Sequence, residues 1–157
     1  MQNPTLLDAT DRLLLEALTR DARMSLKALA AHSGLSSPST AERLRKLEER
    51  GVILGYTAEV DPAALGYAFE AIVRIRPLPG KLHIVQKLIV ETPAITCCDK
   101  VTGDDCFVVR LHARSMAELD TILDRISETA ATNTSIVKAK PVERRSPPLE
   151  ANPFSAG

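Results

Sequence analysis

The stretch SLKALAAHSGLSSPSTAERLRKLEERG, residues 25–51, decides the fold of the N-terminal part of the chain. A serine suited to capping a helix opens it, and Gly34 permits the positive φ with which a chain leaves a helix sharply. Further serines precede Pro38, which is tolerated in the first turn of a second helix that Gly51 ends. Two short helices joined by so tight a turn are typical of a helix–turn–helix.

The flanking segments extend this pattern. Residues 7–23 predict a further helix, because Asp8 can cap it and leucines recur at helical spacing behind it. Beyond the second helix the period changes to two, so residues 52–60 predict a strand. The turn-rich residues 61–67 then predict a linker.

The second half of the chain alternates strand-like and helix-like patterns. Strands are expected at residues 68–76, 94–102, 106–113 and 135–142, and helices at 81–91 and 115–128. A split βαβ unit repeated twice gives this βαββαβ order, which is the ferredoxin-like arrangement. The expected fold class is therefore α+β, a helix–turn–helix followed by a ferredoxin-like domain.

These patterns divide the chain into four parts. We expect the helix–turn–helix in residues 1–52, a linker strand and hinge in 53–68, the ferredoxin-like domain in 69–143 and a disordered tail in 144–157. The tail is expected to be disordered because it has several prolines and no periodicity.

Composition limits the possible functions. The chain has 157 residues, 45% of them hydrophobic, and a formal net charge of zero. Its apolar runs are too short to span a membrane, and no N-terminal export signal is evident. The odd number of cysteines, three, then points to a reducing cytoplasm. With no net positive charge, any surface for nucleic acid must be local.

The second helix of the helix–turn–helix is the candidate DNA-reading element. An inward apolar stripe is expected at Ala41, Leu44 and Leu47, stepping 100° per residue. Small hydroxyls in its first turn and basic residues further along form the expected DNA-binding set: Ser36, Ser37, Ser39, Thr40, Arg43, Lys46 and Arg50. Arg43 could reach a guanine in the major groove, whereas the last two would hold phosphates. The competing interpretation is an ordinary solvated helix with charge pairs.

The stretch ITCCDKVTGDDCF, residues 95–107, contains all three cysteines. Adjacent cysteines on a strand point to opposite faces, so Cys97 and Cys98 cannot both join Cys106 at a zinc ion. A reversible disulfide from Cys106 to either of them is conceivable. The interpretation we favour is cysteine as a small, buried apolar residue. An enzyme would need a nucleophile with a spaced base, a phosphate loop or a metal motif, and the sequence provides no such spacing, so none is expected.

The corner between these cysteines has two interpretations. Gly103 exposes backbone N–H groups, and the carboxylate of Asp104 can hold an ammonium, so together they match the two ends of an α-amino acid. Thr-Gly-Asp-Asp would also form a plain β-turn.

Three segments resemble the Lrp/AsnC family of leucine-responsive and asparagine-responsive transcription regulators. They are LDATDRLLLEAL at residues 7–18, GLSSPSTAERLRKLEERGVILGYTAEVDP at 34–62 and VTGDDCFVV at 101–109. The resemblance runs from Leu7 to about Val142. It implies a winged helix–turn–helix, a hinge and a C-terminal RAM domain (regulation of amino-acid metabolism) that binds effectors and forms oligomers.

The resemblance also implies partners and an effector loop. Family members dimerise through their sheets, often assemble into octamers, and bind amino acids or related molecules between subunits. The implied effector residues are Thr102, Gly103, Asp104, Asp105 and Thr134, although Asp105 replaces the usual aromatic residue and Cys106 the usual second aspartate. We therefore expect a cytoplasmic, nucleoid-associated bacterial or archaeal regulator on a pseudo-palindromic operator, with no cofactor beyond its effector. The alternative is a DNA-binding regulator that senses thiol oxidation through its three cysteines.

Overall fold

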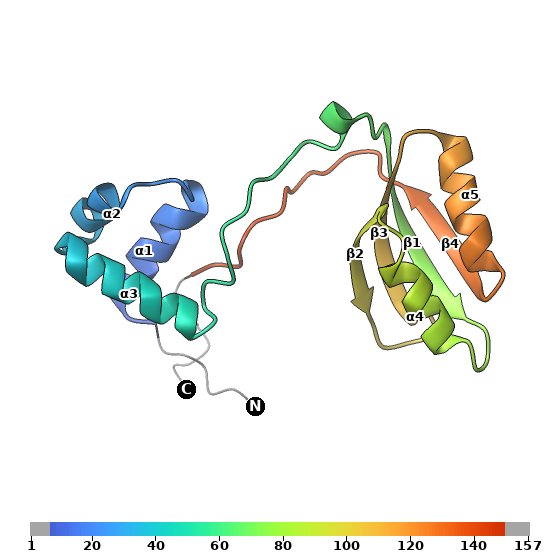
Figure 1. Cartoon of the computed structure of the whole chain (residues 1–157), viewed down its shortest axis with the longest axis horizontal. Coiled ribbons are helices and arrows are strands. Elements are labelled where there is room, and N and C mark those ends of the chain that lie inside the picture. The colour runs from blue at the N-terminus through green and yellow to red at the C-terminus, as the bar shows by residue number, and fades with distance from the viewer. Residues whose placement is uncertain (1–6, 150–157) are drawn as a thin grey trace. The chain divides into compact units, whose positions relative to one another are not determined.

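The computed structural model describes residues 7–149, which divide into two compact units. One unit contains residues 7–58 and 142–149, and the other contains residues 59–141. The first holds three helices, α1 to α3, and the second holds the four-stranded sheet with α4 and α5 (Figure 1). The C-terminal residues 150–157 of the expected disordered tail lie outside the described part, and residues 144–149 form neither helix nor strand.

The helical unit confirms the predicted helix–turn–helix. Its helices are α1 (Ala9–Arg20), α2 (Leu26–Ser33) and α3 (Ser37–Glu49). Asp8 caps α1, and Asp11 three residues on completes a capping box. Gly34 ends α2 in the left-handed conformation at φ 70°, which is why glycine suits the turn. Leu14, Ala17 and Leu29 pack together as the small core between the helices.

The inward face of α3 differs from the predicted one. Thr40 is fully buried and Leu47 fully buried, whereas Ala41 is exposed. The predicted stripe was therefore wrong by one residue at its first position. Thr40 is tolerated inside because its hydroxyl donates to the Ser36 carbonyl at 3.0 Å, which leaves no unpaired polar atom.

The strand predicted at residues 52–60 was wrong. These residues form no helix or strand in the structure. Leu54 is 95% exposed and Tyr56 and Val60 are more than half exposed, so most of the predicted apolar face is open to solvent. Alternation alone does not make a strand, because the backbone also needs a partner for its hydrogen bonds. A short 3₁₀ helix, η1 (Ala63–Leu65), follows in the other unit.

The second unit has the predicted ferredoxin-like order. Its elements are β1 (Phe69–Pro77), α4 (Leu82–Val90), β2 (Ile95–Lys100), β3 (Phe107–Ala113), α5 (Met116–Ser127) and β4 (Ala130–Ile136). The sheet order is β2-β3-β1-β4, and every neighbouring pair is antiparallel. The last strand begins five residues before the predicted segment, because AATNTSI pairs with β1 although its polar residues hide the alternation.

One face of the sheet is covered and the other is open. Val73, Ile75 and Val109 face the helices and pack with buried residues of α4 and α5. The opposite face presents Ile72 and Val108, which are half-buried, among charged side chains. None of the helices within residues 7–149 is long and apolar enough to cross a membrane.

Candidate DNA-binding and effector sites

The first turn of α3 presents serine hydroxyls at the surface. Ser36 caps the helix, and its Oγ accepts from the Ser39 backbone N–H at 3.3 Å and lies 2.8 Å from the Ser39 Oγ. Ser36 and Ser39 are exposed and Ser37 is half-buried. Each hydroxyl retains capacity for a further hydrogen bond. Thr40, placed in the same predicted set, is buried beneath them, so the structure excludes it as a direct DNA contact.

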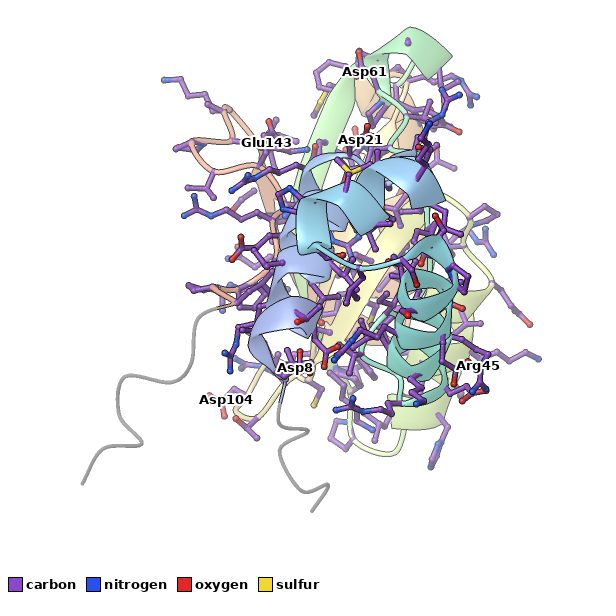
Figure 2. The ribbon with its side chains drawn as sticks, turned by 90° about the vertical axis from the view of Figure 1, so that its left-hand side faces the viewer. Asp8, Asp21, Arg45, Asp61, Asp104 and Glu143 are labelled. Atoms are coloured by element: carbon purple, nitrogen blue, oxygen red, sulfur yellow. The ribbon has the colours of Figure 1, made fainter. Side chains whose placement is uncertain are left out.

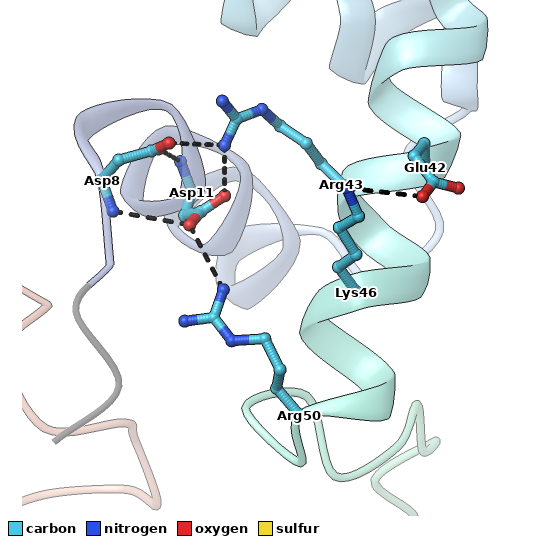
Figure 3. Close-up of polar contacts among 6 residues, drawn as sticks. All are labelled: Asp8, Asp11, Glu42, Arg43, Lys46 and Arg50. Carbon is cyan, nitrogen blue, oxygen red and sulfur yellow. Dashed lines mark hydrogen bonds and ion pairs between the residues drawn. The ribbon is translucent and has the colours of Figure 1, made fainter. Parts of the chain in front are cut away.

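Arg43 does not stand free on the outer face of α3. Its Nη1 atom donates to Asp8 Oδ2 at 2.6 Å and to Asp11 Oδ1 at 2.7 Å, as Figure 3 shows. The Asp11 side chain is only 8% exposed, whereas that of Arg43 is 34% exposed. The backbone N–H of Asp11, and then Arg43, lower the pKa of the Asp8 carboxyl. The side chain predicted to read a base is thus tied to the start of α1.

The other basic residues of α3 differ in their freedom. Arg50 approaches Asp11 at 3.9 Å, so it also turns toward α1 (Figure 3). Lys46 pairs with Glu42 at 3.5 Å, and both side chains are about half exposed. Arg45, which the predicted set omitted, projects from α3 (Figure 2) and pairs with Glu42 and Glu49. Lys46 is therefore the cation of the predicted set that is most available to a phosphate.

A polar pocket of about 400 Å³ lies on the open face of the sheet. It is lined by Arg74, Arg76, Asp105, Ala131, Thr132 and Asn133. Arg76 donates to Asp105 at 3.4 Å and lies 3.8 Å from Asp104. Arg74 and Asp105 are 4.0 Å apart, which is longer than a hydrogen bond. Neither arginine was identified from the sequence as a site residue. Their spacing of two residues on one strand nevertheless predicts that they share a face of the sheet.

The predicted effector residues are only partly brought together. Asp105 lines the pocket, and Asp104 stands at the tip of the β2–β3 loop with its side chain 90% exposed (Figure 2). Gly103 has φ 110°, a conformation that favours glycine, and Thr102 is exposed beside it. Thr134 is opposite Val73 on β1, so it shares the helix-covered face and not the face of the pocket.

The prediction that the cysteines are buried packing residues was wrong for Cys97 and Cys98, whereas Cys106 is half-buried and packs against the core of the sheet unit. Cys97 and Cys98 are exposed on the edge strand β2, and Cys106 is half-buried. The Val101 backbone N–H donates to the Cys106 carbonyl, so Cys106 lies opposite Val101. Val101 is three residues after Cys98, which separates Cys106 from Cys98 by roughly 10 Å along the strand direction. That separation excludes the conceivable disulfide, whose Cα atoms must lie within about 7 Å. Burial, and then Asp99, raises the pKa of the Cys98 thiol, which disfavours the reactive thiolate.

Comparison with known proteins tests the resemblance. A family model for winged helix-turn-helix DNA-binding domains matches residues 7–53, and one for the Lrp/AsnC ligand binding domain matches residues 70–147. The HTH-type transcriptional regulator LrpA of Mycobacterium tuberculosis is 35% identical over 129 residues, covering 82% of this chain and 86% of the relative. The chain belongs to the Lrp/AsnC family.

Solved Lrp/AsnC structures share the fold. The feast or famine regulatory protein from M. tuberculosis complexed with L-methionine has a TM-score of 0.83 and 32% identity, covering 90% of this chain and 98% of that one. B. subtilis LrpC has a TM-score of 0.83 and 29% identity, covering 88% of this chain and 99% of that one. Together these comparisons establish this chain as a DNA-binding Lrp/AsnC-type transcription regulator with an α+β fold.

Glu70 is a largely buried charged residue on the open face of the sheet of this Lrp/AsnC protein. The Glu70 side chain is 14% exposed, accepts from Lys140 Nζ at 2.7 Å and also pairs with Arg110. Burial raises the pKa of its carboxyl, but Lys140 and Arg110 outweigh burial and leave the pKa lowered. Glu70 therefore connects β1 to β3 and to the segment that follows β4.

Glu70→Gln is expected to lower the free energy of unfolding by about 1 kcal/mol at pH 7, because both cations lose their counter-charge but remain partly hydrated. A folded-state pKa below the ordinary 4.5 means that the ion pairs stabilise the protein above that pH. The difference from the native chain should therefore shrink as the pH falls below 4.5. Urea unfolding from pH 7 to 3 measures it, with Glu91→Gln as the exposed control; a pH-independent difference contradicts the assignment.

Proposed function

We propose that this regulator binds a pseudo-palindromic operator as a homodimer and responds to a small amino-acid effector in its C-terminal domain. The observation that carries the DNA-binding part is the exposed first turn of α3, where serine hydroxyls meet a capped helix start within a helix–turn–helix. The dipole and backbone N–H groups of such a helix start attract phosphate, and small side chains allow close approach to base edges.

Within the predicted DNA-binding set, the residues take different roles. Ser36, Ser37 and Ser39 face the DNA at the start of α3, and Lys46 holds a phosphate. Arg43 and Arg50 turn toward Asp11, so we assign them to holding α3 against α1 instead of reading bases. An electrophoretic mobility shift on the upstream region of the protein's own gene tests DNA binding. Equal affinity for that region and for unrelated DNA of the same length would contradict sequence-specific recognition.

Lys46→Ala is expected to weaken DNA binding several-fold on every sequence, because a phosphate contact carries no base information. The slope of log K against log salt should decrease in magnitude by about 1 for each protomer bound. Fluorescence anisotropy over a salt series measures both quantities. Lys87→Ala is the matched control, since Lys87, like Lys46, pairs with a glutamate four residues away, at 3.7 Å, but lies on α4. An unchanged salt slope for Lys46→Ala would remove Lys46 from the interface.

The open sheet face supports the homodimer. It combines the half-buried Ile72 and Val108 with charged residues of both signs, among them Glu70 and Arg110. A sheet that packs helices on one face commonly buries its other face against a second layer. A two-fold axis through this face would pair each copy with an identical surface and give two α3 helices for one operator. Further assembly into an octamer is proposed on family resemblance alone.

The polar pocket supports the effector part of the proposal. The related M. tuberculosis protein was solved with L-methionine. In this chain Asp105 offers a carboxylate for an ammonium, and Arg74 and Arg76 offer guanidinium groups for a carboxylate. If the proposed dimer covers this face, the ligand would lie between subunits, where it could favour one assembly over another only by binding it more tightly.

A further inference from the structure

The polar pocket contains two positive side chains and one negative one. Arg74, Arg76 and Asp105 are the charged residues of its lining. Asp104 reaches Arg76 at 3.8 Å from outside the lining, but its side chain is 90% exposed, so water screens it strongly. The lining therefore has an excess of one positive charge.

A neutral amino acid would leave that excess unmatched. Its ammonium can pair with Asp105 and its carboxylate with one arginine, which leaves the second guanidinium without an anionic partner from the ligand. An α-amino dicarboxylic acid has two negative groups and one positive group, the inverse of the lining. On the basis of the proposed function, we propose that the effector of this pocket is an acidic α-amino acid.

The geometry of the strands agrees with this assignment. Arg74 and Arg76 are two residues apart on β1, so their side chains leave the same face about 7 Å apart along the strand. Asn133 is opposite Arg74, and Ala131 is opposite Arg76. The amide of Asn133 can hydrogen-bond a carboxylate, and the small Ala131 leaves room above the strand. Each guanidinium can thus take one carboxylate of a short diacid.

The hydrogen-bonding capacity of the arginines is largely unused by Asp105. Arg76 reaches it with one bond of 3.4 Å, and Arg74 remains 4.0 Å away. A guanidinium carries five N–H donors in a planar fork that suits bidentate carboxylate binding. The lining also offers little to a branched or thioether side chain, because Ala131 supplies its one apolar side chain. Leucine or methionine would therefore gain little by burial here.

The test is a thermal-shift and calorimetric comparison on the full chain. The probes are L-glutamate and L-aspartate against L-glutamine, L-asparagine, L-leucine and L-methionine, all at matched ionic strength. The two acids should raise Tm by several degrees at a concentration about 100 times Kd. Their neutral amides should bind at least about tenfold more weakly, since each lacks one carboxylate.

Two variants locate the binding. Arg74→Gln and Arg76→Gln should each weaken glutamate binding about tenfold or more, whereas glutamine binding should weaken only in the variant that loses the arginine of the α-carboxylate. Arg125→Gln, an exposed arginine on α5, is the control, and circular dichroism verifies that each variant is folded. Arg74→Lys, which keeps the charge but not the fork, should bind glutamate with intermediate affinity.

The outcomes separate this inference from the proposed function. Neutral amino acids that bind as tightly as glutamate, or glutamate binding that neither arginine variant affects, would overturn the acidic assignment. Absence of any amino-acid binding would overturn it as well. A mobility shift without added ligand tests the DNA-binding function independently, so its failure would be seen even where glutamate binds.

Discussion

Arg43→Ala is expected to weaken operator binding about tenfold without changing the slope of log K against log salt. The reason is that Arg43 orients the DNA-reading helix but contacts no phosphate. Arg43 joins α3 to Asp8 and Asp11, and removing it leaves the buried Asp11 carboxylate without its nearest cation. Loss of a charged hydrogen bond typically costs about 1–3 kcal/mol, and the partial exposure of Arg43 favours the lower half of that range. Anisotropy titrations over a salt series and urea unfolding measure the two effects.

The carboxylates provide the control for this prediction. Asn caps a helix as well as Asp does, so Asp8→Asn combined with Asp11→Asn removes both charges while keeping the cap. This double variant should reproduce the loss of affinity, and adding Arg43→Ala to it should cost little more, because the three residues act as one unit. A direct base reader would behave differently: Arg43→Ala would relax specificity at one operator position and lower the salt slope in either background.

In the helical unit, sequence patterns predicted the local features of the helices but not the contacts between distant residues. The caps at Asp8 and Ser25 and the stop at Gly34 were predicted correctly, because each depends on residues within one helical turn. The role of Arg43 could not be predicted in this way, because its partners Asp8 and Asp11 lie 35 and 32 residues earlier in the chain. The buried Thr40 illustrates a second limit: a hydroxyl that bonds the preceding turn behaves as an inward residue despite its polarity.

The sheet unit shows the same division. Strands β1 and β3 alternate clearly because one face packs on helices, so their positions and the βαββαβ order followed from the pattern. Strand β4 has few apolar residues, and its pairing with β1 had no periodic signal. The pocket arginines were missed for a related reason. Arg74 and Arg76 form a candidate binding site only because the fold places Asp105, from the β2–β3 loop, beside them.

The proposed homodimer leads to the other large expected effect. Ile72→Lys should shift the protein toward monomer and weaken operator binding about a hundredfold or more, since joining two DNA-binding units multiplies affinity by roughly 10²–10⁴. Ile72 is opposite Arg110 and Ser135 on the open face. The new ammonium would therefore lie beside the positive charge of Arg110, and burying it against a second copy would cost much free energy. In a monomer the lysine remains hydrated, and the fold should survive.

Sedimentation equilibrium measures the assembly, and anisotropy titration measures operator binding. Ile84→Lys is the matched control, because Ile84 is a 45% exposed isoleucine on α4, which packs against the opposite face of the sheet. A control variant that dissociates while Ile72→Lys remains dimeric would place the interface on the helix layer instead. If neither variant dissociates and both bind the operator normally, the sheet face is not what brings two α3 helices together, and another surface must do so.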